Sequence, residues 1–298
     1  MINIKKLFIL STIAFLIVAY FFSLKTDTLV ERGEMSVTLI GAGDIADCAR
    51  DTDEKTVKLL ERFPSSTVFT TGDNVYPVGT VEAYSQCYGP SWGKVKARTR
   101  PSPGNHDYIQ GTDSYFSYFG ENAGEKGRGY YSYNLDSWHI VMLDSECING
   151  CGTTSSQYEW LENDLKTAHA ACTIAMWHHP VFSSGMHSNS GRARNLWNLL
   201  YDYSTEIVVN GHDHIYERFA PQNKNGQTDF QGIREFIVGT GGKDLYTVTA
   251  VQPNSEVRNT ETFGVIKFDL KPKSYSWEFI PIEGSTFTDK GQGDCYTR

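Results

Sequence analysis

Five short motifs follow one another along the chain, and each places a side chain that could bind a metal ion just after a run that is typical of a buried strand. Aspartate, asparagine, tyrosine and histidine supply oxygen and nitrogen ligands, which suit zinc, manganese and iron. Two ions held close together need one ligand that contacts both, and a carboxylate can do this. The set therefore predicts a dinuclear metal site. Its members are Gly43-Asp44, Gly72-Asp73-Asn74-Val75-Tyr76, Gly104-Asn105-His106-Asp107, Trp177-His178-His179-Pro180 and Gly211-His212-Asp213-His214.

The motifs differ in how strongly each one predicts a ligand by itself. An aspartate after a glycine is common in turns, so Asp73 alone would not indicate a metal ligand. Tyr76 makes the motif more specific, because its phenol follows three residues later and could bind the same ion. His212 and His214 are alternate residues, and alternate residues of an extended chain point the same way. A packed core tyrosine at position 76 and a simple turn around Asn105 are the structural alternatives.

Six of the eight histidines lie in or beside these motifs. Among them, His106 could donate a hydrogen bond to a phosphate or to a leaving group. His139 and His169 lie elsewhere, and we interpret them as a hydrogen-bonded core histidine and a solvated helix end. Histidine chemistry is therefore expected at one place in the fold.

The elements that must carry the motifs alternate between strands and helices. Runs of apolar and β-branched residues lead into Asp44, Asp73, His178 and His212, as in strands buried on both faces. Such alternation indicates an α/β fold with the functional loops at the strand ends. Ser155 is a plausible N-cap for a helix expected at 155–169. Helices are expected at 53–63, 155–169 and 193–203, a hairpin at 129–135 and 138–144, and strands of a second sheet at 235–238, 264–270 and 275–281.

The N-terminus predicts export from the cytoplasm. Lys5 and Lys6 precede an apolar run at 7–24, as in a signal peptide or an uncleaved membrane anchor with the rest of the chain outside. Residues 25–35 are expected to be a linker, and 36–298 one folded domain. Residues 25–298 carry 25 basic and 35 acidic side chains, a net charge of −10 that argues against sequence-independent nucleic-acid binding.

All six cysteines follow the apolar run, and their even number in an exported chain indicates disulfides. Cys147 and Cys151 could close a tight loop, but the sequence does not choose among the 15 possible pairings. Metal binding by the thiolates is the alternative, which the absence of Cys-x-x-Cys pairs disfavours.

Taken together, the five motifs resemble those of the calcineurin-like metallophosphoesterases, and within them the purple acid phosphatases. The resemblance covers roughly residues 37–219, and the Gly-His-x-His-x-Tyr-Glu-Arg sequence at 211–218 is similar to the plant-type enzymes. It implies a four-layer α-β-β-α sandwich with two mixed sheets and a metal site on loops at the strand ends. Residues 36–298 would then be the catalytic domain.

The resemblance also implies two sets of ligands that share one aspartate. The first ion, ferric iron in that family, would be bound by Asp44, Asp73, Tyr76 and His214. The second, a divalent iron, zinc or manganese ion, would be bound by Asp73, Asn105, His178 and His212. His178 takes this role because the family motif is His-x-Pro, which leaves His179 to orient a neighbour or line the pocket.

One position separates the subfamilies. Most metallophosphoesterases begin with Asp-x-His, but Ala46 stands where that histidine would be. The purple enzymes also lack this histidine and use a tyrosine instead, which matches Tyr76. The match is incomplete, because the family usually has glycine at position 46 and because Asp47 is an additional carboxylate nearby.

The expected activity is hydrolysis of small phosphate monoesters by hydroxide generated at the two ions, with His106 and His187 stabilising charge or protonating the leaving group. His187 is included because plant-type relatives keep catalytic histidines in the corresponding loop. One alternative is a phosphodiesterase or nucleotidase that uses zinc or manganese without Tyr76. Another is a non-catalytic surface binding module on the same fold.

Overall fold

The structure is a computed structural model that describes residues 36–187 and 190–296. The predicted export segment at 1–24 and the linker at 25–35 lie outside these residues. Within the described ranges, no helix combines the length and apolar character that crossing a membrane requires. Residues 36–298 form one compact unit.

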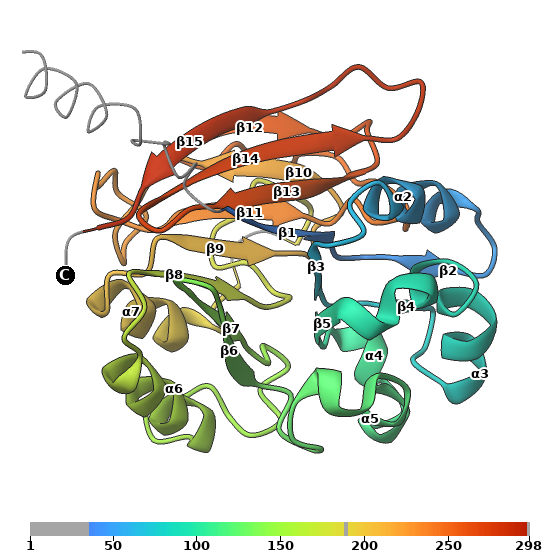
Figure 1. The fold of residues 1–298 in the computed structure, drawn as a ribbon, viewed down its shortest axis with the longest axis horizontal. Helices are drawn as coiled ribbons and strands as arrows, with labels where there is room; N and C mark the ends of the chain where they lie inside the picture. The colour runs from blue at the N-terminus through green and yellow to red at the C-terminus, as the bar shows by residue number, and fades with distance from the viewer. Residues whose placement is uncertain (1–35, 188–189, 297–298) are drawn as a thin grey trace, which may run out of the picture. The chain divides into compact units, whose positions relative to one another are not determined.

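Two mixed sheets make up the centre of this unit (Figure 1). The first has the strand order β15-β14-β13-β1-β3-β5, in which β1, β3 and β5 are parallel and β13 runs antiparallel to β1. Its strands are β1 (Val37–Ala42), β3 (Thr67–Thr71), β5 (Thr99–Ser102), β13 (Gly264–Leu270), β14 (Ser274–Pro281) and β15 (Lys290–Asp294).

The second sheet has the order β12-β10-β11-β9-β8-β7-β6, with β7, β8, β9 and β11 parallel. Its strands are β6 (Tyr131–Leu135), β7 (Trp138–Met142), β8 (Cys172–Met176), β9 (Ile207–Asn210), β10 (Tyr216–Phe219), β11 (Arg234–Val238) and β12 (Ser255–Asn259). A short ladder pairs β2 (Ala46–Asp47) with β4 (Val75–Tyr76).

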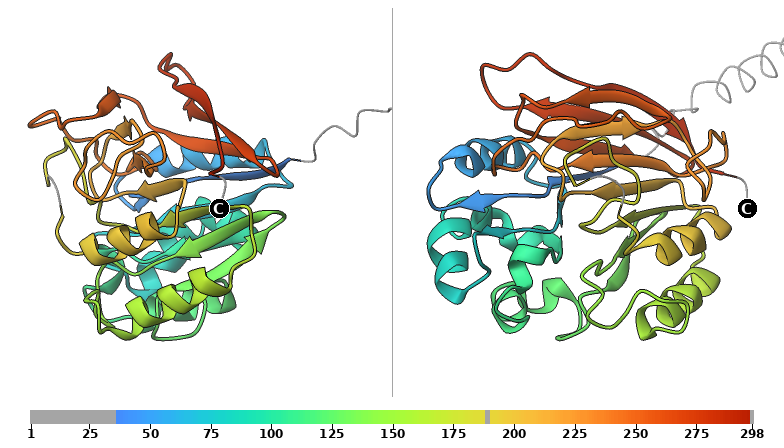
Figure 2. Two further views of the ribbon diagram at one scale, coloured as in Figure 1. Left: turned by 90° about the vertical axis from the view of Figure 1, so that its left-hand side faces the viewer. Right: turned by 180° about the vertical axis from the view of Figure 1, so that it is seen from behind.

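Helices cover the outer faces of both sheets, which gives the expected four layers (Figure 2). α2 (Thr52–Glu61) packs near β13, and α6 (Ser156–Thr167) and α7 (Arg194–Asp202) pack on the second sheet. The remaining short helical segments are α3 (Val81–Ala83), η1 (Tyr84–Tyr88), η2 (Trp92–Arg98), α4 (Asn105–Tyr108), α5 (Asp113–Phe119) and η3 (Gly120–Ala123).

The alternation of side chains along each strand divides the core into two clusters. In β7, Ile140 and Met142 belong to the cluster between the sheets, whereas Val141 packs with α6 and α7. In β9, Val209 faces inward and Val208 faces the helices. Both faces of the second sheet are therefore apolar, as the uninterrupted apolar runs of its strands predict.

The expected helices and most expected strands are confirmed within a few residues. Ser155 caps α6 by accepting a hydrogen bond from the backbone N–H of Tyr158, and the hairpin turns at Asp136, which has a φ of 54°. The expectation of a separate second sheet in the final third is wrong. There, β11 pairs with β9 and β13 pairs with β1, so these strands extend the two sheets already present.

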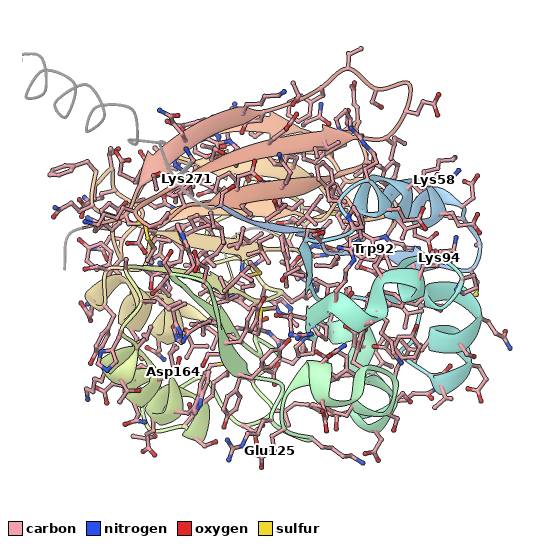
Figure 3. All side chains as sticks on the ribbon, in the orientation of Figure 1. Lys58, Trp92, Lys94, Glu125, Asp164 and Lys271 are labelled. Carbon is pink, nitrogen blue, oxygen red and sulfur yellow. A yellow bond between two sulfur atoms is a disulfide. The ribbon has the colours of Figure 1, made fainter. Side chains whose placement is uncertain are left out.

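The six cysteines form three disulfides, Cys48–Cys87, Cys147–Cys151 and Cys172–Cys295. The predicted disulfides are confirmed, and no thiolate is left to bind a metal ion. His139 is the predicted core histidine, since its Nε2 lies 2.7 Å from Asp164 Oδ2 on α6 (Figure 3) and its Nδ1 lies 3.0 Å from Asn134 Oδ1.

Candidate metal centre

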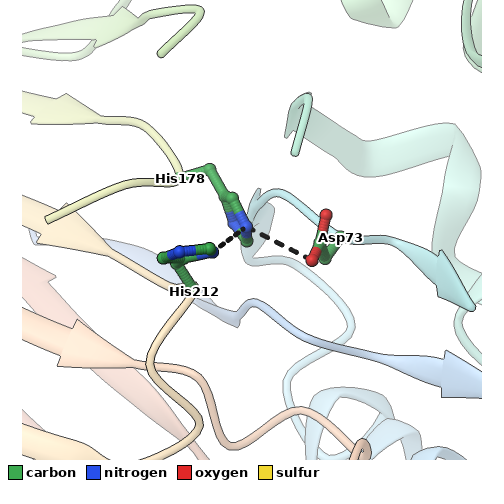
Figure 4. Close-up of side chains that lie close together, drawn as sticks. All are labelled: Asp73, His178 and His212. Atoms are coloured by element: carbon green, nitrogen blue, oxygen red, sulfur yellow. Dashed lines mark hydrogen bonds and ion pairs between the residues drawn. The ribbon is translucent and has the colours of Figure 1, made fainter. Parts of the chain in front are cut away.

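The candidate ligands come from the carboxyl ends of parallel strands in both sheets. Asp44 and Asp73 each lie two residues beyond the end of β1 and β3, and Asn105 lies three residues beyond β5. His178 and His212 each lie two residues beyond β8 and β9. Parallel strands bring these loops to one edge of the sheets, where Asp73, His178 and His212 meet (Figure 4).

The backbone at this edge is in an unusual conformation. Asp44, Asp73 and His212 have φ angles of 58°, 48° and 68°, in the left-handed region that non-glycine residues rarely adopt. Such conformations persist where surrounding structure holds them, and they concentrate at functional sites. Gly211, which precedes His212, has no room for a side chain. A Cβ at this position would lie 2.6 Å from Asp44 Oδ2.

One group of side chains surrounds the phenol oxygen of Tyr76. This oxygen lies 2.8 Å from Asp44 Oδ1, 2.9 Å from Asp73 Oδ2 and 3.1 Å from His214 Nε2. His214 Nε2 also lies 3.2 Å from Asp44 Oδ1. All four side chains are buried, so the tyrosine presents its hydroxyl to the group and is more than a packed core residue.

A second group surrounds Nε2 of His178. This nitrogen lies 3.3 Å from Asp73 Oδ2, 3.2 Å from Asn105 Oδ1 and 3.1 Å from His212 Nδ1. Asp73, His178 and His212 offer ligand atoms that all lie within 4.8 Å of one another, as a metal-binding group requires. Asp73 Oδ2 thus belongs to both groups, and the seven predicted ligands are brought together.

Hydrogen bonds behind the groups set the orientation of two imidazoles. His178 Nδ1 donates to the carbonyl oxygen of Thr71 at 2.9 Å, and His214 Nδ1 donates to that of Asp244 at 2.5 Å. In both rings Nε2 then faces the cluster, where it can offer a lone pair to an ion once it is deprotonated. Metal-ligating histidines commonly have this arrangement.

The electrostatics of the cluster also suit cations. Burial lowers the pKa of His178, but the charge and hydrogen bond of Asp73 outweigh it and raise the pKa to about 10. Burial, followed by the charges of His178 and His187, lowers the pKa of His212 to about 3. Two buried carboxylates and three converging imidazole nitrogens, without a thiolate, fit a pair of metal ions of the zinc, manganese or iron type, which would displace the proton from His178.

The two predicted proton-transfer histidines lie beside the groups. His106 Nδ1 lies 2.7 Å from the carbonyl oxygen of Pro77, and its Nε2 lies 4.0 Å from Asp73 Oδ2. The ring of His187 lies 4.3 Å from that of His212, between centroids. Both side chains are partly exposed, at 32% and 40%, so a substrate could reach them.

His179 lies beside the cluster without joining either group. Its Nδ1 lies 3.0 Å from Ser145 Oγ and 3.1 Å from Glu146 Oε1, and its ring packs 4.2 Å from that of His212. The prediction that His179 orients a neighbour or lines the site, and that His178 points into the cluster, agrees with this geometry.

The sequence analysis did not identify several residues at the site. Tyr246 stacks on His214 with ring centroids 3.9 Å apart, and Lys243 Nζ lies 2.5 Å from Asp47 Oδ2 and 5.2 Å from the ring centre of Tyr76. Both lie in the loop between β11 and β12, which contains no metal-binding motif. Asp47, the additional carboxylate, is therefore paired with a lysine.

Known proteins with similar sequences were found by comparison. Residues 28–216 match the family model described as calcineurin-like phosphoesterase. Purple acid phosphatase 15 of Arabidopsis thaliana is 32% identical over 153 residues, which cover 47% of this chain and 28% of that protein. Purple acid phosphatase 21 of the same plant is 28% identical over 240 residues, covering 70% of this chain and 54% of that protein. The chain thus matches only part of the length of these relatives.

Solved structures show the same fold. A purple acid phosphatase from yellow lupin (Lupinus luteus) seeds has a TM-score of 0.67 at 18% identity, with 87% of this chain and 54% of that chain covered. GAP50, the anchor in the inner membrane complex of Plasmodium, has a TM-score of 0.66 at 15% identity, with 88% and 90% covered. At these identities the likeness concerns the fold alone.

Proposed function

The chain belongs to the calcineurin-like phosphoesterases, and from this membership we propose that it hydrolyses small phosphate monoesters at two metal ions, as purple acid phosphatases do. The observation that carries the proposal is the position of Asp73 Oδ2, which lies 2.9 Å from Tyr76 Oη in one group and 3.3 Å from His178 Nε2 in the other. A carboxylate oxygen shared in this way suits a ligand that bridges two ions.

In the proposed site, Asp44, Asp73, Tyr76 and His214 hold one ion, and Asp73, Asn105, His178 and His212 hold the other. Bound ions supply positive charge for the phosphate oxygens and a lower pKa for water at the site. The overall reaction forms a bond from water oxygen to phosphorus and breaks the bond from phosphorus to the alcohol oxygen, which gains a proton.

The protein's own groups then position the ester and supply that proton. His106 Nδ1 donates to the carbonyl oxygen of Pro77, so its Nε2 remains for the substrate. His187 lies near the other group, against the ring of His212. We propose that these two histidines bind the phosphate and protonate the departing oxygen, which is the general-acid role that histidine most often fills.

Tyr76 favours ferric iron at the first position. Burial and the charges of Asp44 and Asp73 raise the pKa of this phenol well above 10. A strongly acidic cation is needed for such a phenol to bind as a phenolate, and a trivalent ion is more acidic than zinc. The second position would take iron, zinc or manganese. If Tyr76 does not bind the ion, a zinc or manganese phosphodiesterase or nucleotidase becomes the better description.

We also propose that the catalytic unit works outside the reducing cytoplasm. Three disulfides within residues 36–296 are stable in oxidising compartments. This agrees with the export segment predicted at 1–24, whose cleavage or retention as an anchor through residues 7–24 stays a prediction.

The test is to purify the full chain, measure its bound metals, and assay p-nitrophenyl phosphate and bis(p-nitrophenyl) phosphate. We expect two metal ions per chain and faster hydrolysis of the monoester. Asp73→Asn and His212→Ala should each lower kcat/KM by at least about 100-fold and release metal. His139→Gln is the matched control, because it alters a buried histidine outside the cluster. Activity that survived in either site variant would exclude this site.

The visible spectrum separates ferric iron from zinc or manganese. A tyrosinate bound to ferric iron absorbs visible light intensely, so the iron-loaded chain should be purple and Tyr76→Phe should be colourless. A colourless, zinc-loaded chain that preferred the diester would favour the phosphodiesterase alternative.

A further inference from the structure

Asp213 is the unassigned residue between His212 and His214, and its carboxylate is fully buried. It points at the segment 183–187, which continues the chain beyond His178. A buried carboxylate costs free energy unless hydrogen bonds compensate for its lost hydration, so its partners indicate what it does.

The segment 183–187 wraps around this carboxylate. Ser183 Oγ donates a short hydrogen bond to Oδ2, and the backbone N–H of His187 donates to Oδ1 at 2.9 Å. Gly185 N–H donates to Ser183 Oγ at 2.9 Å and closes the turn. The approach is so close that a Cβ on Gly185 would lie 2.3 Å from Asp213 Cγ.

The imidazole of His187 is held by the same oxygen. Its Nδ1 lies 3.2 Å from Asp213 Oδ1, and its ring packs against His212 at 4.3 Å and edge-on to Tyr246 at 5.5 Å between centroids. Nδ1 therefore donates to the carboxylate. Nε2, on the far side of the ring, has no hydrogen-bond partner among residues 36–187 and 190–296.

We propose that Asp213 is the positioning residue of His187: it fixes the ring with Nδ1–H toward the carboxylate, so that Nε2 is presented to the substrate beside the metal centre. Asp213 itself contacts neither the substrate nor an ion. The inference rests on the proposed phosphatase function for its kinetic consequence, but the ring orientation can be measured independently of any activity.

A double-mutant cycle tests the kinetic part. Asp213→Ala and His187→Ala should each lower kcat by about 10- to 100-fold, in the range found for partners that orient a reacting group. The double variant should be no slower than His187→Ala alone, because Asp213 acts through that ring. Bound metal should stay at two ions per chain. Asp213→Asn removes the charge of the carboxylate, so it weakens the preference of His187 for the Nδ1–H form, and it serves if the alanine variant does not fold.

Asp289→Asn is the matched control. Asp289 is also a buried carboxylate, and it accepts hydrogen bonds from Tyr216 Oη at 2.7 Å, Arg218 Nε at 2.7 Å and Trp277 Nε1 at 3.1 Å, with none from 183–187. Its loss should lower thermal stability and leave kcat within about two-fold. Losses in the double variant that multiply, or a loss of activity that follows metal content, would show a purely structural role and overturn the proposal.

The second readout is the nitrogen-15 spectrum of the histidine rings in the metal-free full chain, with His187 assigned from the spectrum of His187→Ala. The wild-type chain should show the Nδ1–H form of His187, and Asp213→Asn should show a mixture or the Nε2–H form. An unchanged ring signal would overturn the inference even if the chain is a phosphatase. A changed signal in a chain without phosphatase activity would overturn only the proposed function.

Discussion

Buried carboxylates in this chain serve two purposes, which their hydrogen-bond partners distinguish. Asp44 and Asp73 face a phenol and imidazoles, as ligands would. Glu217 and Glu235 instead accept backbone N–H groups from the segment that follows His178, with Ser184 bonded to Glu217 at 2.9 Å and Val181 bonded to Glu235 at 3.1 Å. The second pair therefore supports the segment that leads to His187, and its effect should appear in stability.

Glu235 makes that effect depend on pH. Complete burial raises the pKa of Glu235 from 4.5 to about 8. Between those values the folded chain keeps a proton that the unfolded chain has lost. Protonated Glu235 therefore contributes its full stabilisation below about pH 4.5, and this contribution falls as the pH rises to about 8. Each unit of pKa shift corresponds to about 1.4 kcal/mol of unfolding free energy, so the total loss is a few kcal/mol.

Glu235→Gln should remove this dependence. The side-chain amide of Gln222 now donates to Glu235, and its Oε1 has no partner among the described residues. If this amide is turned over, Gln222 Oε1 can accept a hydrogen bond from residue 235, whether that residue is a protonated glutamate or a glutamine. We expect the stability of the wild type relative to the variant to be greater at pH 5 than at pH 8.5, measured by urea unfolding of the metal-free chain. A difference that is constant with pH would show that Glu235 is ionised throughout.

The sequence predicted the candidate ligands that the structure brings together, and it missed the residues that support them. Apolar runs lead into Asp44, Asp73, His178 and His212, and the motifs of the family resemblance supplied the remaining candidate ligands. The role of Asp213 depends on Gly185 leaving room for its carboxylate, and the stacking of Tyr246 on His214 joins residues 32 positions apart. Those contacts exist only after the two sheets have formed.

A helix or strand could be predicted from the sequence where its own residues, and not its distant partners, determine it. α6 has a side-chain cap and helical spacing of Leu161 and Leu165, and it begins and ends close to its predicted bounds. In contrast, β2 and β4 are two residues each, and they are defined only by pairing with one another. Which sheet β11 and β13 join is also decided by distant partners, so both strands were predicted but their sheet assignment was wrong.

The junction between β5 and α4 is the element that fits most tightly against a candidate ligand. Gly104 has an extended backbone, with a φ of −126°, that any residue can adopt, but a Cβ there would lie 2.3 Å from the backbone nitrogen of Asp73. Gly104→Ala must therefore push the two loops apart. Such overpacking costs about 1–3 kcal/mol.

We expect Gly104→Ala to lower Tm in the metal-free chain and to reduce the rise in Tm that added zinc produces, because the Asp73 and Asn105 loops would no longer meet correctly. Gly152→Ala is the matched control, since no heavy atom of the described residues lies within 4 Å of its added Cβ. A zinc-induced rise equal to that of the wild type would mean that the centre tolerates separation of the loops.

At the scale of residues 36–298, one disulfide links the two sheets. Cys172 begins β8 in the second sheet, and its partner Cys295 directly follows β15 at the edge of the first. The bridge closes a segment of 123 residues. It lies at the start of β8, whereas His178 follows the end of that strand, so it should contribute to stability and not to the metal centre. Cys147–Cys151 closes only four residues, next to the Ser145 and Glu146 side chains that contact His179.

Removal of the long bridge should therefore affect mainly stability, and removal of the short bridge should affect mainly activity. Loop-closure entropy assigns about 5 kcal/mol to the long bridge and about 2 kcal/mol to the short one. We expect Cys172→Ala with Cys295→Ala to lower the unfolding free energy strongly while kcat at 25 °C is unchanged. Cys147→Ala with Cys151→Ala should lower it less but reduce kcat, because His179 packs on His212. Urea unfolding and steady-state assays of both variants test this, and a large loss of kcat in the first variant with bound metal retained would show that the distance between the sheets tunes the centre.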